Sequence, residues 1–135
     1  MTKEIFLNEY SRFVDGVTSQ PSKDKDAFLE RMSELYDQGC NVERLLTAAC
    51  GLAAESGEFM EIVKKILFQG KPFNDDNRFH MKRELGDVMF YWAEACIALN
   101  IDPYSVIDEN IKKLESRYPG GFSIERSEVR SKNDL

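Results

Sequence analysis

Cysteine, histidine and proline are scarce in this 135-residue sequence, which has three, one and four of them. Cys40, Cys50 and Cys96 show neither a CxxC motif nor the Cys/His spacing of a metal site, which argues against a zinc centre. Their odd number argues against a disulfide framework. We therefore expect reduced core thiols and a cytoplasmic protein.

Positive charge is also in short supply. Lysine and arginine number 18 against 24 aspartate and glutamate, which leaves a formal net charge of −6. General nucleic-acid binders need a basic surface that displaces counterions from phosphates, so we expect no stable nucleic-acid binding. If such an acidic protein binds phosphates, it must use a metal ion or a few well-placed cations.

Long apolar runs are missing as well. The longest run, residues 88–99, is interrupted by Glu94 and is too short to span a bilayer. The N-terminal residues lack the apolar stretch of a signal peptide. The sequence therefore predicts no membrane association.

The sequence as a whole has the balance of a globular protein, with 42% hydrophobic and 31% charged residues. Apolar residues recur at helical spacing almost throughout, and no segment shows the strict alternation of a half-buried strand. This pattern predicts an all-α bundle of about five helices in a single domain over residues 1–123, followed by a polar tail at 124–135. The predicted helices cover residues 3–17, 25–38, 42–68, 77–99 and 103–118.

Four carboxylates border the apolar stripes of the two long central helices. Glu55 and Glu58 lie three residues apart on helix 42–68, and Glu84 and Asp87 do so on helix 77–99. Packing the stripes together would bring four negative charges to one half-buried place, where repulsion and desolvation disfavour full ionisation. Oxygen ligands suit hard cations, and Mg²⁺ prefers a few carboxylates with water and phosphates. We predict a Mg²⁺ site between these helices, although such pairs are also common on exposed helices.

Three segments in order carry a family resemblance: residues 45–58 with Glu55 and Glu58, the Glu84–Asp87 pair, and residues 110–122. Over residues 42–123 the sequence resembles the MazG-like nucleoside triphosphate pyrophosphohydrolases. That family shares an E-x-x-E pair, a later E-x-x-D pair and often a late N-x-K-K-L-x-x-R-Y-P-x-G-F segment. One departure is Ala54, where many relatives have a further glutamate.

The resemblance implies hydrolysis of (deoxy)nucleoside triphosphates between the α- and β-phosphates, which gives a monophosphate and pyrophosphate. It implies an all-α catalytic core at 42–123, a homodimer or homotetramer, and one or two Mg²⁺ ions that Mn²⁺ can replace. The implied metal ligands are Glu55, Glu58, Glu84 and Asp87. The general base is Glu55 or Glu58, because a carboxylate can act as ligand or, through a water, as base.

Five further residues are candidates for nucleotide or phosphate contact. Lys65 lies two turns beyond Glu58 on nearly the same face, so it is either a phosphate contact or a solvated lysine. Tyr91, one turn after Asp87, is a candidate for nucleoside contact. We expect no functional role for His80, the single histidine. The late family segment supplies Asn110, Lys113 and Arg117.

Two other functions are compatible with the sequence. One is an all-α dUTP/dCTP pyrophosphatase of narrower specificity, and the other is a non-catalytic nucleotide-binding module for oligomerisation or regulation. Phe79 and Phe90 lie off the main stripe of helix 77–99, and residues 3–38 add two amphipathic segments. This surplus of apolar surface also favours self-association.

Overall fold

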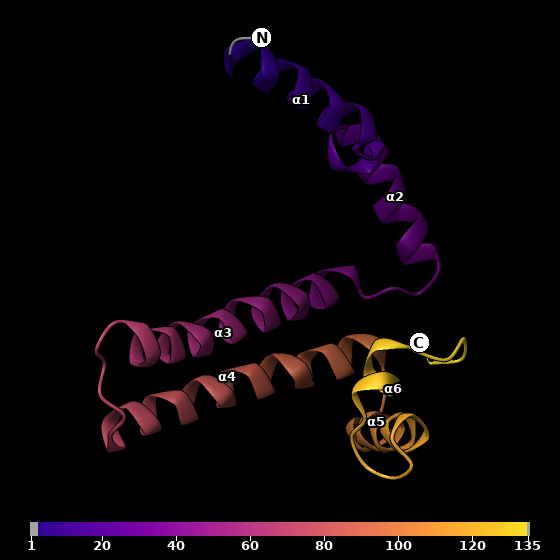
Figure 1. Ribbon diagram of the computed structural model, residues 1–135. Coiled ribbons are helices and arrows are strands. Elements are labelled where there is room, and N and C mark those ends of the chain that lie inside the picture. Colours follow the sequence, from indigo (N-terminus) through magenta and orange to yellow (C-terminus); the bar gives the residue numbers. More distant parts are fainter. Residues whose placement is uncertain (1–2, 135) are drawn as a thin grey trace. The chain divides into compact units, whose positions relative to one another are not determined.

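Helices make up the fold of this protein, whose computed structural model describes residues 3–134 (Figure 1). No strand occurs within that range, and the prediction of an all-α fold is confirmed. No helix in the range is long and apolar enough to cross a membrane. The elements are α1 (Lys3–Val17), the short 3-10 helix η1 (Gln20–Ser22), α2 (Lys25–Asp37), α3 (Val42–Phe68), α4 (Asp75–Leu99), α5 (Pro103–Arg117) and α6 (Ile124–Glu128).

The chain divides into two compact units, one reaching to Val42 and the other beginning at Glu43. In the first unit, the Lys23 Nζ donates a hydrogen bond to the Asp15 carbonyl oxygen at 2.7 Å, which ties the start of α2 to the end of α1. Asp24 caps α2 by accepting from the Ala27 amide at 2.8 Å. The expectation of a single domain over residues 1–123 remains a prediction.

The boundaries of the helices in the second unit follow from local chemistry. Asn74 caps α4 by accepting from the Asn77 amide at 3.0 Å, so the helix begins at Asp75, two residues before the predicted start at residue 77. Asn100 ends α4 in the left-handed conformation. Asp102 then caps α5, and Pro103 occupies its first position.

Helices α3 and α4 run antiparallel and side by side (Figure 1). An ion pair of 3.4 Å joins Arg44 near the start of α3 to Glu94 near the end of α4. Small residues of α3 lie at the contact, where Ala48 is fully buried and Gly51 meets the ring of Tyr91. With Gly51 against the Tyr91 ring, the middle of α3 lies opposite the middle of α4.

The C-terminal segment returns to α5. Residues 124–135, which we expected to be a polar tail, include the short helix α6 with Ser123 as its N-cap. Beyond α6, Asp134 forms an ion pair with Arg117 at the end of α5. The side chains of Arg117 and Asp134 are only 12% and 10% exposed, so this contact anchors the segment.

Candidate metal and nucleotide site

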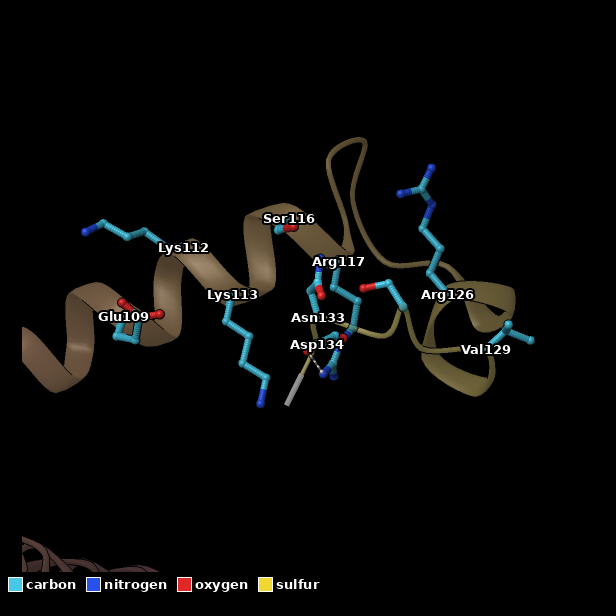
Figure 2. Close-up of a pocket in the computed structure, with 10 residues that line it drawn as sticks. Glu109, Lys112, Lys113, Ser116, Arg117, Arg126, Val129, Asn133 and Asp134 are labelled. Carbon is cyan, nitrogen blue, oxygen red and sulfur yellow. Dashed lines mark hydrogen bonds and ion pairs between the residues drawn. The ribbon is translucent and has the colours of Figure 1, made fainter.

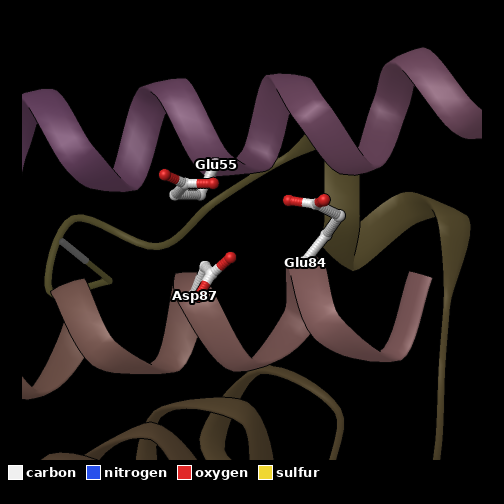
Figure 3. A group of neighbouring side chains, drawn as sticks. All are labelled: Glu55, Glu84 and Asp87. Atoms are coloured by element: carbon white, nitrogen blue, oxygen red, sulfur yellow. The ribbon is translucent and has the colours of Figure 1, made fainter. Parts of the chain in front are cut away.

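Three of the four predicted metal ligands meet between α3 and α4. One carboxylate oxygen each from Glu55, Glu84 and Asp87 lies within 4.8 Å of the other two (Figure 3). Glu84 and Asp87 share a face of α4 because they are three residues apart, and α3 presents Glu55 to that face. Glu55 and Glu84 are half-buried, whereas Asp87 is exposed.

Glu58, the fourth predicted ligand, lies one turn after Glu55 on α3 and is exposed. It falls outside the group of three carboxylates, although its negative charge still acts on Glu55. The arrangement separates Glu58 from the other three in space and leaves its role as ligand or base a prediction.

The electrostatics of Glu55 show the cost of bringing these groups together. Burial, followed by the negative charges of Asp87, Glu84 and Glu58, raises the pKa of the Glu55 carboxyl. A hydrogen bond with Glu84 acts in the same direction. All of these influences disfavour the charged form of Glu55, and a bound cation would oppose them. Because the donor atoms are all carboxylate oxygens, the group fits a hard divalent cation.

His80 lies beside this cluster, where we had expected an ordinary residue. Its Nε2 is 3.0 Å from the Glu84 Oε1, one helical turn away on α4. Close contacts of this kind orient carboxylates that serve as metal ligands. The spacing of four residues between His80 and Glu84 was the signal in the sequence for this contact.

An open cavity of about 450 Å³ adjoins the cluster and shares Glu55 with it. Tyr91 lines this cavity, and its contact with a nucleoside stays a prediction. Cys50 also lines it and is exposed, so the prediction of a core thiol was wrong at this position, while Cys96 is buried as expected. The other lining residues are Leu46, Thr47, Gly51 and Ala54, all from α3.

Gly51 sets how closely Tyr91 approaches α3. A Cβ atom added at Gly51 would lie far inside van der Waals contact with the Tyr91 ring, which is too close for any side chain. Glycine is therefore required here by the packing of the two helices. The requirement for glycine at position 51 could not be predicted from the sequence, because the contact with Tyr91 joins two helices and leaves no local pattern.

Two of the predicted nucleotide contacts, Lys65 and Asn110, do not line the cavity beside Glu55. Lys65 is exposed and pairs with Glu61 on its own helix at 3.2 Å, which is the arrangement of a solvated lysine. Asn110 is exposed on α5. A phosphate or nucleotide role for either residue stays a prediction.

Lys113 and Arg117, the other two predicted phosphate contacts, line a second cavity of about 490 Å³ between α5 and the C-terminal segment (Figure 2). Arg117 is held there by Asp134. Five of the predicted site residues thus form two groups in this unit. Glu55, Glu84 and Asp87 lie between α3 and α4, and Lys113 and Arg117 lie at the end of α5. The charged residues lining the second cavity are Glu109, Lys112, Lys113, Arg117, Arg126 and Asp134.

Comparison with known proteins identifies one family. The family described as the MazG nucleotide pyrophosphohydrolase domain matches residues 44–122, which include the acidic cluster and all of α5. The "Gene 37 protein" of Mycobacterium phage L5 is 37% identical over 82 residues, which cover 60% of this chain and 72% of the phage protein. No solved structure matches the chain significantly.

Proposed function

Because this chain belongs to the MazG nucleotide pyrophosphohydrolase family, we propose that it hydrolyses (deoxy)nucleoside triphosphates between the α- and β-phosphates. The products would be a nucleoside monophosphate and pyrophosphate. The observation that carries the proposal is the meeting of Glu55, Glu84 and Asp87 inside the region that matches the family. Three carboxylates without a phosphate-binding metal would repel this substrate, whereas the same three would hold the metal that binds it.

Mg²⁺ is the proposed cofactor, as one or two ions, with Mn²⁺ able to replace it. The bound ion would neutralise charge on the phosphates and lower the pKa of an attacking water. In this chain Glu55, Glu84 and Asp87 would hold the metal, and His80 would orient Glu84. Glu58 is exposed one turn from Glu55, which suits either a fourth ligand or the base that accepts the water proton.

The cavity beside Glu55 is the proposed site for the nucleoside. Its wall combines the Tyr91 ring with the hydroxyl of Thr47 and the apolar side chains of α3. Aromatic rings with a few polar groups are typical of sites that bind ring-shaped ligands. Lys113 and Arg117, with Asn110 and Lys65, are the proposed phosphate contacts, supplied by the same chain or by a second copy.

Self-association into a homodimer or homotetramer is part of the proposal. Leu85 and Met89 lie one turn apart on α4 and are 55% and 60% exposed in the single chain. Exposed apolar side chains on successive turns favour burial against another copy. Light scattering of the purified protein tests this point. The cytoplasmic location expected from the cysteine pattern is likewise proposed.

The direct test is release of pyrophosphate from each nucleoside triphosphate, with and without Mg²⁺. We expect metal-dependent release, and Asp87→Asn to lower turnover by about 100-fold or more, the usual loss on removing one preorganised electrostatic group. Glu58→Gln distinguishes its two roles, because losing a ligand raises the Mg²⁺ concentration required, whereas losing a base lowers turnover at saturating Mg²⁺.

Glu30→Gln on α2 is the matched control, since it removes an exposed carboxylate outside the region that matches the family. It should leave turnover unchanged. Undiminished turnover in both Asp87→Asn and Glu58→Gln would reject the assigned site. Nucleotide binding without pyrophosphate from any triphosphate would reject hydrolysis and favour a binding module.

A further inference from the structure

The cavity at the end of α5 has the charges of an anion-binding site. Lysine and arginine side chains at positions 112, 113, 117 and 126 line it, against the carboxylates of Glu109 and Asp134. Figure 2 shows Lys113 pointing to the same side of α5 as the Arg117–Asp134 pair. With about 490 Å³, the cavity is large enough for a small polyanion.

Asp134 accepts two hydrogen bonds from the Arg117 guanidinium in this cavity. The Arg117 Nη2 donates to the Asp134 Oδ1 at 2.6 Å, and the Arg117 Nε donates to the Oδ2 of the same carboxylate. Arginine binds carboxylates and phosphates through this same two-pronged geometry. The hydrogen bonds from Arg117, together with the positive charges of Arg117, Lys113 and Arg130, lower the pKa of the Asp134 carboxyl against the opposing effect of burial. Asp134 therefore sits as a phosphate oxygen pair would.

The connection that carries Asp134 is short and has no regular secondary structure. Helix α6 ends at Glu128, and no helix includes residues 129–134. Within this connection the Asp134 amide donates to the Ser131 carbonyl oxygen at 3.1 Å. Asp134 can therefore leave Arg117 without the unfolding of a helix, and its return is favoured by the high local concentration that a tether provides.

We propose that the cavity between α5 and the C-terminal segment binds a multiply charged phosphate group at Arg117 and Lys113, and that Asp134 competes for this position as a tethered carboxylate. The inference rests in part on the proposed function, because Lys113 and Arg117 are the proposed phosphate contacts. It adds an acid that must leave before the phosphates bind. A polyphosphate has more charge than one carboxylate and also meets Lys113, so it displaces Asp134.

Binding of inorganic tripolyphosphate in the absence of divalent metal tests the competition by calorimetry. We expect Asp134→Asn to tighten binding by about tenfold, because it removes the charge-assisted competitor from Arg117. Glu128→Gln in α6 removes an equal charge from an exposed position outside the cavity lining and should change affinity less than about twofold. Equal effects of the two variants, or weaker binding to Asp134→Asn, would overturn the proposal.

Two further variants separate competition from a merely structural ion pair. Asp134→Ala should tighten binding as Asp134→Asn does, so the test stands even if the asparagine variant folds poorly. Adding Arg117→Gln to Asp134→Asn should abolish the gain. Hydrogen exchange offers an independent readout: tripolyphosphate should lower protection at the Asp134 amide of the unmodified protein, whereas a structural clamp predicts unchanged protection.

A non-hydrolysable nucleoside triphosphate distinguishes the two sources of phosphate. Tighter binding of the nucleotide than of tripolyphosphate would assign the cavity to the substrate, and equal binding would assign it to free polyphosphate. Both results support a phosphate site with Asp134 as competitor if the Asp134→Asn gain is present. Because no turnover is measured, the result is independent of whether the protein hydrolyses triphosphates.

Discussion

The acidic cluster between α3 and α4 and the basic cavity at the end of α5 handle charge in opposite ways. Around Glu55, burial and the converging carboxylates of two helices raise the pKa of the Glu55 carboxyl. At the end of α5, the chain supplies its own counter-charge, and Asp134 closes on Arg117. The acidic cluster keeps charges of one sign only, whereas the cavity at the end of α5 pairs Arg117 with a carboxylate of the same chain.

This difference indicates how each region would meet a ligand. Repulsion among the carboxylates destabilises the acidic cluster when no cation is bound. A metal ion relieves this repulsion, which adds to its binding affinity. The second region gains nothing comparable, because an incoming anion must first replace a carboxylate. We therefore expect a cation to bind the acidic cluster without displacing any group, and an anion to bind the cavity at the end of α5 only by displacing Asp134.

The largest effect on folding stability should come from Gly51→Ala, which changes the α3–α4 contact without changing any charge. The new methyl group collides with the Tyr91 ring, so we expect a loss of about 1–3 kcal/mol, typical of overpacking. Gly57→Ala on the same helix is the matched control, because a Cβ there meets nothing within 4 Å. It should stabilise α3 by up to about 1 kcal/mol. Thermal unfolding at equal protein concentration measures both, and stabilisation by both variants would disprove a rigid Tyr91 contact.

A smaller effect of opposite sign is expected for Asp87→Asn without metal. Removing one of two like charges three residues apart should stabilise the helix by about 0.2–0.5 kcal/mol. Added Mg²⁺ should raise the unfolding temperature of the unmodified protein but not of this variant, because the ion binds the folded state through Asp87. Lower stability of Asp87→Asn in the absence of metal would contradict an excess of negative charge at this site.

The order in which two carboxyls titrate is the finest test of the comparison, and carboxyl NMR on the metal-free protein can follow it. Glu55 has a raised pKa, so its contribution to stability is present below its ordinary pKa and is lost as pH rises through the raised value. Asp134 has a lowered pKa, so its contribution is present above its ordinary pKa and is lost as pH falls through the lowered value. On acidification Glu55 should be protonated first, and the reverse order would contradict the comparison.

Much of the local structure was predictable from the sequence. The apolar period of α1 to α5 placed the helix ends within about two residues. Gly39 and Gly70, with φ of 80° and 70°, follow the ends of α2 and α3. The cap of α4 and the existence of α6 were not predicted. Asn74 is followed by Asp75, Asp76 and Asn77, which are equally good caps by type. Helix α6 has only five residues, too few for an apolar period to indicate it.

The helices, the family segments and the pairing of Glu84 with Asp87 follow from the sequence, because they depend on spacing along one helix. Packing between helices makes Glu55 join that pair while Glu58 stays outside, since this depends on how α3 is rotated against α4. The tertiary structure alone placed Tyr91 on Gly51 and Asp134 on Arg117, 17 residues away. Helical periodicity specifies which residues share a face, but packing selects the partner that each face meets.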